Sequence, residues 1–194
     1  MPDEKGHNYG NECRNSIIGT VATEKVLEKE FGFKIDPGDP EKDINYKIDA
    51  VTETKDKNGR KVFIAIQYFS KNWENLLPID KVFLSENGMV QLFSEEDLNK
   101  EWRGYAQTEF AKDMEEKIQK TKNGCINFIR DHEKKLGDAK FMLMLATMPV
   151  GSEHKRPIVD ETGELVNKNK KEHFCRQFKD EFDGKVNGKK FLDN

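Results

Sequence analysis

The sequence lacks the motifs that mark several common classes of enzyme. It contains no GxGxxG or GxxxxGK[ST] stretch, so nothing supports nucleotide binding through a glycine-rich loop. GxSxG and HExxH are also absent, which leaves a serine hydrolase or a zincin without support. Only three cysteines occur in 194 residues and none form a CxxC pair, so a zinc knuckle is not expected.

Long apolar runs are missing as well. The longest run, residues 141–146, is far shorter than the roughly 20 residues that a membrane-spanning helix needs. The opening stretch MPDEKGHNYG has no apolar segment of the kind found in signal peptides. The widely spaced cysteines suit free thiols in a reducing compartment. We therefore expect a cytoplasmic protein that does not associate with membranes.

Charge of neither sign is in large excess. The 33 Lys and Arg residues and 36 Asp and Glu residues give a formal net charge of -3, unlike the strongly basic balance of a dedicated nucleic-acid coat protein. A local basic face is still compatible with this balance, and KNKKEHFCR, residues 168–176, is one stretch that could contact phosphates. Hydrophobic residues make up 35% of the chain and occur in clusters, which predicts a folded core.

Hydrophobic periodicity predicts one mixed α/β domain over residues 12–194, after a flexible segment of residues 1–11. A helical pattern covers residues 12–31. Strands are predicted at residues 46–54 and 62–68, around a hairpin turn at Asn58-Gly59. The second strand is apolar on both faces, which is typical of a central strand.

The rest of the chain alternates between further strands and helices. Ser94 and Asp97 have the spacing of a capping box and predict a helix start. Asn123-Gly124 is expected to break that helix. The other predicted elements are strands at residues 81–84, 89–93 and 140–148, helices at 126–136 and 170–182, and a hairpin at 157–166.

Three polar residues occur where apolar residues would be expected. Glu24 lies on or beside the apolar face of the first helix, Asp49 lies within a strand, and Gln67 ends an apolar strand. If the two strands pair around Asn58-Gly59, facing residues have numbers that sum to about 117, which brings Asp49 close to Gln67. Oxygen donors from one helix and two strands can form a site for Mg²⁺ or Mn²⁺. Asp43, in the preceding loop, is a further possible ligand.

The stretches GTVATEKVLEKEFG with Glu24, DINYKIDAV with Asp49 and VFIAIQYFSK with Gln67 resemble the PD-(D/E)XK nuclease superfamily. The resemblance covers about residues 12–75 and implies a restriction-endonuclease-like fold, a mixed sheet flanked by helices. It also implies that Glu24, Asp49 and Gln67 bind one or two Mg²⁺ or Mn²⁺ ions. In that superfamily the metals activate water and stabilise the pentacovalent phosphate during cleavage of DNA or RNA. The expected substrate is DNA, and a homodimer is possible because many such enzymes cut both strands as dimers.

The sequence departs from the superfamily pattern at one position. A lysine usually follows two residues after the Glu or Gln, but Phe69 stands there, and the nearest candidate for the charge-balancing role is Lys71. A degraded nuclease fold that binds nucleic acid or a protein partner is therefore the alternative. A small interaction factor of mobile-element or phage type is a third hypothesis.

Ordinary structural roles also remain open for each candidate residue. Glu24 could be a glutamate at the solvent edge of its helix. Asp49 could pair with Lys47 or Arg60 on an edge strand, and Gln67 could face solvent at a strand end.

Overall fold

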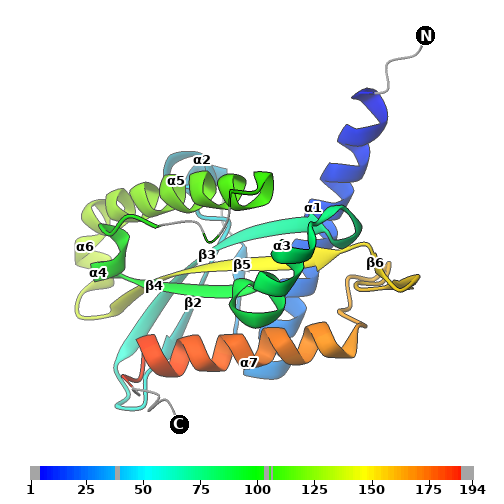
Figure 1. Ribbon diagram of the computed structural model, residues 1–194. Coiled ribbons are helices and arrows are strands. Elements are labelled where there is room, and N and C mark those ends of the chain that lie inside the picture. Colours follow the sequence, from blue (N-terminus) through cyan, green and yellow to red (C-terminus); the bar gives the residue numbers. More distant parts are fainter. Residues whose placement is uncertain (1–4, 38–39, 103–104, 106, 189–194) are drawn as a thin grey trace.

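A mixed five-stranded sheet lies at the centre of the protein, with helices on both faces (Figure 1). The computed structural model describes residues 5–37, 40–102, 105 and 107–188. The strand order is β1-β2-β3-β5-β4. The strands of the sheet are β1 (Asp36–Pro37), β2 (Ala50–Lys55), β3 (Lys61–Asn72), β4 (Val90–Ser94) and β5 (Lys140–Val150).

Seven helices and several short elements complete the described residues. The helices are α1 (Lys5–Phe31), α2 (Pro40–Tyr46), α3 (Pro78–Phe83), α4 (Glu95–Leu98), α5 (Glu109–Asp131), α6 (Glu133–Leu136) and α7 (Lys168–Lys185). A 3₁₀ turn η1 (Trp73–Asn75), a π turn η2 (Leu84–Gly88) and a small hairpin of β6 (Ser152–Glu153) and β7 (Arg156–Pro157) lie between them. None of the described helices is both long and apolar enough to cross a membrane.

The β2–β3 hairpin forms as the sequence predicts. Gly59 takes a positive φ of 79°, and the Asp56 carboxylate accepts the backbone N–H groups of Asn58 and Arg60, each at 2.9 Å. Ala50 faces Ile66, which is within one residue of the predicted register. This pairing places the start of β2 beside the middle of β3.

Strands β3 and β5 run parallel in the middle of the sheet and are buried for most of their length. Helix α5 covers one face, where Phe128 stacks on Phe63 at a centroid distance of 5.6 Å. Helices α1 and α7 cover the other face (Figure 1), where Phe31 of α1 contacts Phe178 of α7 at 4.3 Å. The predicted mixed α/β class, single domain and central position of residues 62–68 are confirmed.

Some predicted elements are wrong. Residues 81–84 form the end of α3 and the start of η2 rather than a strand, because Pro78 starts a helix there. The predicted strand at residues 46–54 begins only at Ala50, since Tyr46 ends α2. Asn123-Gly124 does not break α5, which continues to Asp131.

Other predictions hold with shifted boundaries. The capping box of Ser94 and Asp97 is present, but α4 ends at Leu98 and the next helix starts at Glu109. The first helix begins at Lys5, seven residues before the predicted start. Residues 1–4, 38, 39, 103, 104, 106 and 189–194 lie outside the described residues, so the predictions made for them are not tested.

Side chains of α7 cap the free edge of β4. Gln177 accepts the backbone N–H groups of Met89 at 2.7 Å and Val90 at 3.2 Å, and it donates to the carbonyl oxygen of Leu84 at 2.8 Å. Glu181 accepts the N–H group of Leu92 at 2.9 Å. Helix α7 therefore satisfies backbone donors that an edge strand would otherwise offer to another chain.

Replacing Gln177 by alanine should lower the stability of the domain. The substitution leaves several buried backbone groups without a partner, so we expect a loss of about 2 kcal/mol and a fall in Tm of roughly 4–8 °C. Thermal unfolding measures this change, with Lys179→Ala on an exposed position of the same helix as the control. An unchanged Tm in Gln177→Ala would show that these hydrogen bonds do not hold α7 in place.

Candidate active site

Asp49 and Gln67 lie in contact where β2 begins, beside the middle of β3. Gln67 does not end its strand as predicted, because β3 continues to Asn72. The N–H group of Asp49 donates to the carbonyl oxygen of Ile66 at 2.9 Å, which fixes the residue just before β2. Asp49 Oδ2 accepts the N–H group of Tyr68 at 2.7 Å and also the amide N–H of Gln67. The predicted proximity of Asp49 and Gln67 is therefore confirmed.

Helix α5 adds a lysine and a threonine to this pair. The Lys117 ammonium donates to the carbonyl oxygen of Tyr68. Thr121, one helical turn further on, donates to the carbonyl oxygen of Lys117 at 2.9 Å and lies 3.5 Å from Gln67 Oε1. Asp49, Gln67, Lys117 and Thr121 are called the Asp49 cluster below.

The Asp49 cluster contains two partly buried groups of opposite charge, the Asp49 carboxylate and the Lys117 ammonium. Burial raises the pKa of Asp49, whereas the N–H group of Tyr68 and the Lys117 ammonium lower it. Burial lowers the pKa of Lys117, and the carboxylates of Asp49 and Asp43 oppose that change. Asp43, from α2, thus lies near enough to act on both groups. Titratable groups with pKa values shifted by burial and by specific neighbours are common at functional sites.

Phe69 and Lys71 occupy the positions in β3 that follow Gln67. The Lys71 ammonium forms an ion pair with Asp113 of α5 at 2.8 Å and lies 5.4 Å from the centroid of the Phe69 ring. The Lys117 ammonium lies 5.1 Å from the same ring centroid. The Phe69 ring therefore faces two ammonium groups at distances typical of cation–π contacts.

Glu24 lies on the opposite face of the sheet from Gln67. Neighbouring residues of a strand project to opposite faces, so Gln67 points toward α5 and Tyr68 points toward α1. The Tyr68 hydroxyl donates to Glu24 at 3.1 Å. Burial raises the pKa of Glu24, the Tyr68 hydroxyl lowers it and Glu28 raises it further. Glu24 is thus joined to the Asp49 cluster through Tyr68, whose own backbone contacts Asp49 and Lys117.

The oxygen donors present are of the type that Mg²⁺ and Mn²⁺ prefer. The carboxylates of Asp49 and Asp43 and the amide oxygen of Gln67 are all hard ligands. Gln67 turns its amide nitrogen toward Asp49, and a half-turn of the amide group would exchange the nitrogen for the oxygen. In the described part of the chain, no three His, Cys, Asp or Glu side chains lie close enough together to hold a metal ion. Water and a substrate phosphate would have to supply the remaining ligands.

Sequence reasoning missed Lys117, Thr121 and Tyr68. Lys117 lies next to Ile118 and three residues after Met114, both buried members of the apolar face of α5. The position of Lys117 beside that face could have indicated a functional residue, because a charged side chain close to the hydrophobic core needs a polar partner. The pairing of this helix with the end of β3 depends on the tertiary fold, which the spacing of residues did not reveal.

The protein is thus of the mixed α/β class, and in the Asp49 cluster a carboxylate and an amide lie beside a lysine next to the middle of β3. No protein-family model matches the chain, and no curated protein or solved structure matches it significantly. The restriction-endonuclease-like fold remains a prediction carried by the sequence stretches quoted above.

Proposed function

We propose that this protein is a metal-dependent nuclease that hydrolyses phosphodiester bonds in nucleic acid, with DNA as its principal substrate. The observation that carries the proposal is the Asp49 cluster. Two oxygen-bearing side chains and an ammonium group meet at the backbone of Tyr68. An acid, an amide and a lysine in contact are the groups needed to hold a divalent cation and to neutralise a phosphate.

The contacts suggest a role for each residue of the site. Asp49 and Gln67, with Asp43, would hold Mg²⁺ or Mn²⁺, which when bound lowers the pKa of water and offsets charge on the phosphate. Lys117 places a positive charge beside the phosphate position, in the role expected for Lys71. Glu24 acts through the Tyr68 hydroxyl as a positioning residue.

Cleavage assays with the wild-type protein test this proposal. Supercoiled plasmid, linear duplex, single-stranded DNA and RNA are each incubated with Mg²⁺, with Mn²⁺ or with EDTA. We expect cleavage of at least one DNA substrate in the presence of metal and none in EDTA. Intact substrates in both metals, with protein whose folding is verified by circular dichroism, would contradict the proposal.

Replacing Lys117 by methionine should slow cleavage about 100-fold, because one preorganised charge near the reacting phosphate contributes on this scale. Methionine keeps most of the aliphatic volume of lysine, so the fold should persist. The control is Lys120→Met on the same helix, where the exposed lysine pairs with Glu116, and its rate should stay within about twofold of wild type. Equal rates for both variants would remove Lys117 from the site.

The pH dependence gives an independent readout of Lys117. Burial lowers the pKa of Lys117 below its usual 10.5, so the ammonium loses its proton at a lower pH than a free lysine would. Cleavage should therefore decline on the alkaline side, and Lys117→Arg should move that decline to higher pH because arginine stays charged. A decline at the same pH in both proteins would show that another group titrates.

A binding module without catalysis is the second candidate. Two observations favour it: the Gln67 amide nitrogen already satisfies Asp49, and an aromatic ring stands at the usual lysine position. This candidate predicts that the protein shifts nucleic acid in a gel equally well in EDTA and in Mg²⁺, without cleaving it. The nuclease proposal predicts tighter binding with metal, which completes the site for a phosphate.

A further inference from the structure

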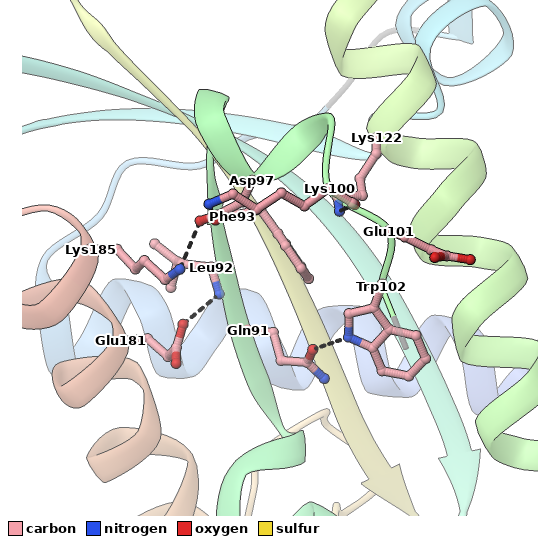
Figure 2. A pocket seen from close by; sticks show the side chains of 10 residues that line it. All are labelled: Gln91, Leu92, Phe93, Asp97, Lys100, Glu101, Trp102, Lys122, Glu181 and Lys185. Atoms are coloured by element: carbon pink, nitrogen blue, oxygen red, sulfur yellow. Dashed lines mark hydrogen bonds and ion pairs between the residues drawn. The ribbon is translucent and has the colours of Figure 1, made fainter. Parts of the chain in front are cut away.

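A polar cavity lies beside β4 and contains none of the residues of the Asp49 cluster. It has a volume of about 290 Å³ and is bounded by β4, by α4 and the residues that follow it, by α5 and by α7 (Figure 2). It is called the β4 cavity below. Its volume is near the lower end of the range for small-molecule sites.

Lys122 of α5 brings a buried positive charge to the β4 cavity. The residue is only 1% exposed, and its ammonium donates to the carbonyl oxygen of Lys100 at 2.6 Å and lies 5.0 Å from the centroid of the Phe93 ring. It forms no ion pair with a carboxylate of the described residues. Asp97, Glu101 and Glu181 also line the cavity, but none of them forms an ion pair with Lys122. Burying an ammonium without a carboxylate in contact is costly, so an anion beside Lys122 would be stabilising.

The carboxylate of Asp97, which acts on Lys122 electrostatically, is already paired with other lysines. Asp97 pairs with Lys100 at 2.9 Å and with Lys185 at 2.7 Å, and it also accepts the N–H group of Ser94 at 3.2 Å. Burial lowers the pKa of Lys122, while Asp97 raises it and the two other lysines lower it. Two ammonium groups thus pair with Asp97, and the Lys122 ammonium lies near them without an ion pair of its own.

A further carboxylate, Glu181, lies on the α7 side of the cavity, and an aromatic ring, Trp102, lies on the α5 side (Figure 2). Glu181 is committed to the N–H group of Leu92. The Trp102 indole N–H donates to Gln91 Oε1 at 3.2 Å, and the indole borders the cavity (Figure 2). The amide nitrogen of Gln91 is buried and has no hydrogen-bond partner among the described residues. A ring nitrogen or carbonyl oxygen of a ligand is the acceptor that this group lacks.

We propose that the β4 cavity binds a mononucleotide unit, with its phosphate beside Lys122 and its base against Trp102. A phosphate supplies the negative charge that Lys122 lacks, and a planar base fits the indole and offers acceptors to Gln91. The unit has two possible sources, a free nucleotide or the end of a nucleic-acid strand. This binding does not require the nuclease activity of the Asp49 cluster.

Calorimetry and tryptophan fluorescence with the four 5′-ribonucleoside monophosphates test the proposal. At least one should bind, and the corresponding nucleoside and inorganic phosphate should each bind at least 10-fold more weakly. Lys122→Met should weaken nucleotide binding at least 10-fold, whereas Lys120→Met, exposed on the same helix, should leave it unchanged. Tighter binding of a 5′-phosphorylated trinucleotide than of the monomer would identify a strand end as the source, and weaker binding a free nucleotide.

Trp102→Leu provides a second variant. Because Trp102 is only partly buried, this substitution should disturb folding less than Lys122→Met. It should also weaken binding about 10-fold, through the loss of stacking. The proposal is overturned if neither the monophosphates nor the trinucleotide bind to the wild type at millimolar concentration. It is equally overturned if inorganic phosphate binds as tightly as a nucleotide, or if Lys122→Met and Trp102→Leu both bind like wild type.

Discussion

Asp49→Asn is expected to reduce metal-dependent cleavage by at least 1,000-fold, as an order-of-magnitude estimate for removal of the main metal-binding charge. Asparagine preserves the size of the side chain and an oxygen that can accept the N–H group of Tyr68. It removes the carboxylate charge that Mg²⁺ or Mn²⁺ would require. Single-turnover cleavage with saturating protein measures the loss without interference from weak substrate binding.

Glu24→Gln is the matched control for Asp49→Asn. Both substitutions neutralise a partly buried carboxylate, but Glu24 contacts the Tyr68 hydroxyl on the opposite face of the sheet. The expected loss for Glu24→Gln is about 10-fold or less, since the residue acts through Tyr68. A larger loss for Glu24→Gln than for Asp49→Asn would place the metal site on the α1 face and contradict the assignment made here.

Asp49→Asn should also change how the stability of the fold depends on pH. Burial raises the pKa of Asp49 above its usual 3.8, so the folded protein holds this proton more tightly than the unfolded chain does. The stabilisation from that proton is complete below pH 3.8 and is lost as the pH rises through the folded pKa. The Tm of Asp49→Asn relative to wild type should therefore increase as the pH rises above 3.8. A relative Tm that falls over this range would show that the charged carboxylate stabilises the fold.

Gly124→Ala should be among the most destabilising single substitutions outside the site. A Cβ atom at this position would lie 1.9 Å from the carbonyl oxygen of Tyr46 at the end of α2. Backbone must move to relieve that overlap, so we expect a loss of about 3 kcal/mol and a fall in Tm of roughly 6–12 °C. Because α2 also carries Asp43, the same displacement should weaken metal binding.

Gly184→Ala on α7 is the control for Gly124→Ala. A Cβ atom at Gly184 meets no atom within 4 Å, so alanine should raise stability slightly, by up to about 1 kcal/mol, through its higher helix propensity. Thermal unfolding of the two variants in the same buffer gives the Tm of each. It compares alanine in the tight contact between α5 and α2 with alanine at an open position of α7. A Gly124→Ala protein as stable as Gly184→Ala would show that α2 does not press against α5.

Local patterns predicted the part of the site that lies in one hairpin. Asn58-Gly59 and the alternation around it fixed the register closely enough to bring Asp49 to Gln67. The turn is specified by residues within it, with Gly59 at a positive φ and Asp56 accepting two backbone N–H groups. Such short-range determinants are readable from the sequence because the interacting residues are neighbours along the chain.

The features that depend on packing between distant elements were not predictable in this way. Asn123-Gly124 predicts a helix break, yet α5 continues through Gly124. The absence of a side chain there lets α5 approach α2 closely. Lys117 lies on α5, 49 residues after Tyr68 along the chain. The separation of Glu24 from Gln67 likewise depends on the alternation of β3 and the placement of α1. A one-residue change in the register of β3 would turn Gln67, rather than Tyr68, toward α1.

The most direct test of the central claim is a calorimetric titration of Mn²⁺ into the wild type and into Asp49→Asn, each with a short DNA duplex present to supply phosphate ligands. The account predicts one binding event per chain in the wild type and its loss in Asp49→Asn, with both proteins folded. Binding of equal affinity in the two proteins, or no binding to the wild type, would contradict a metal site at Asp49.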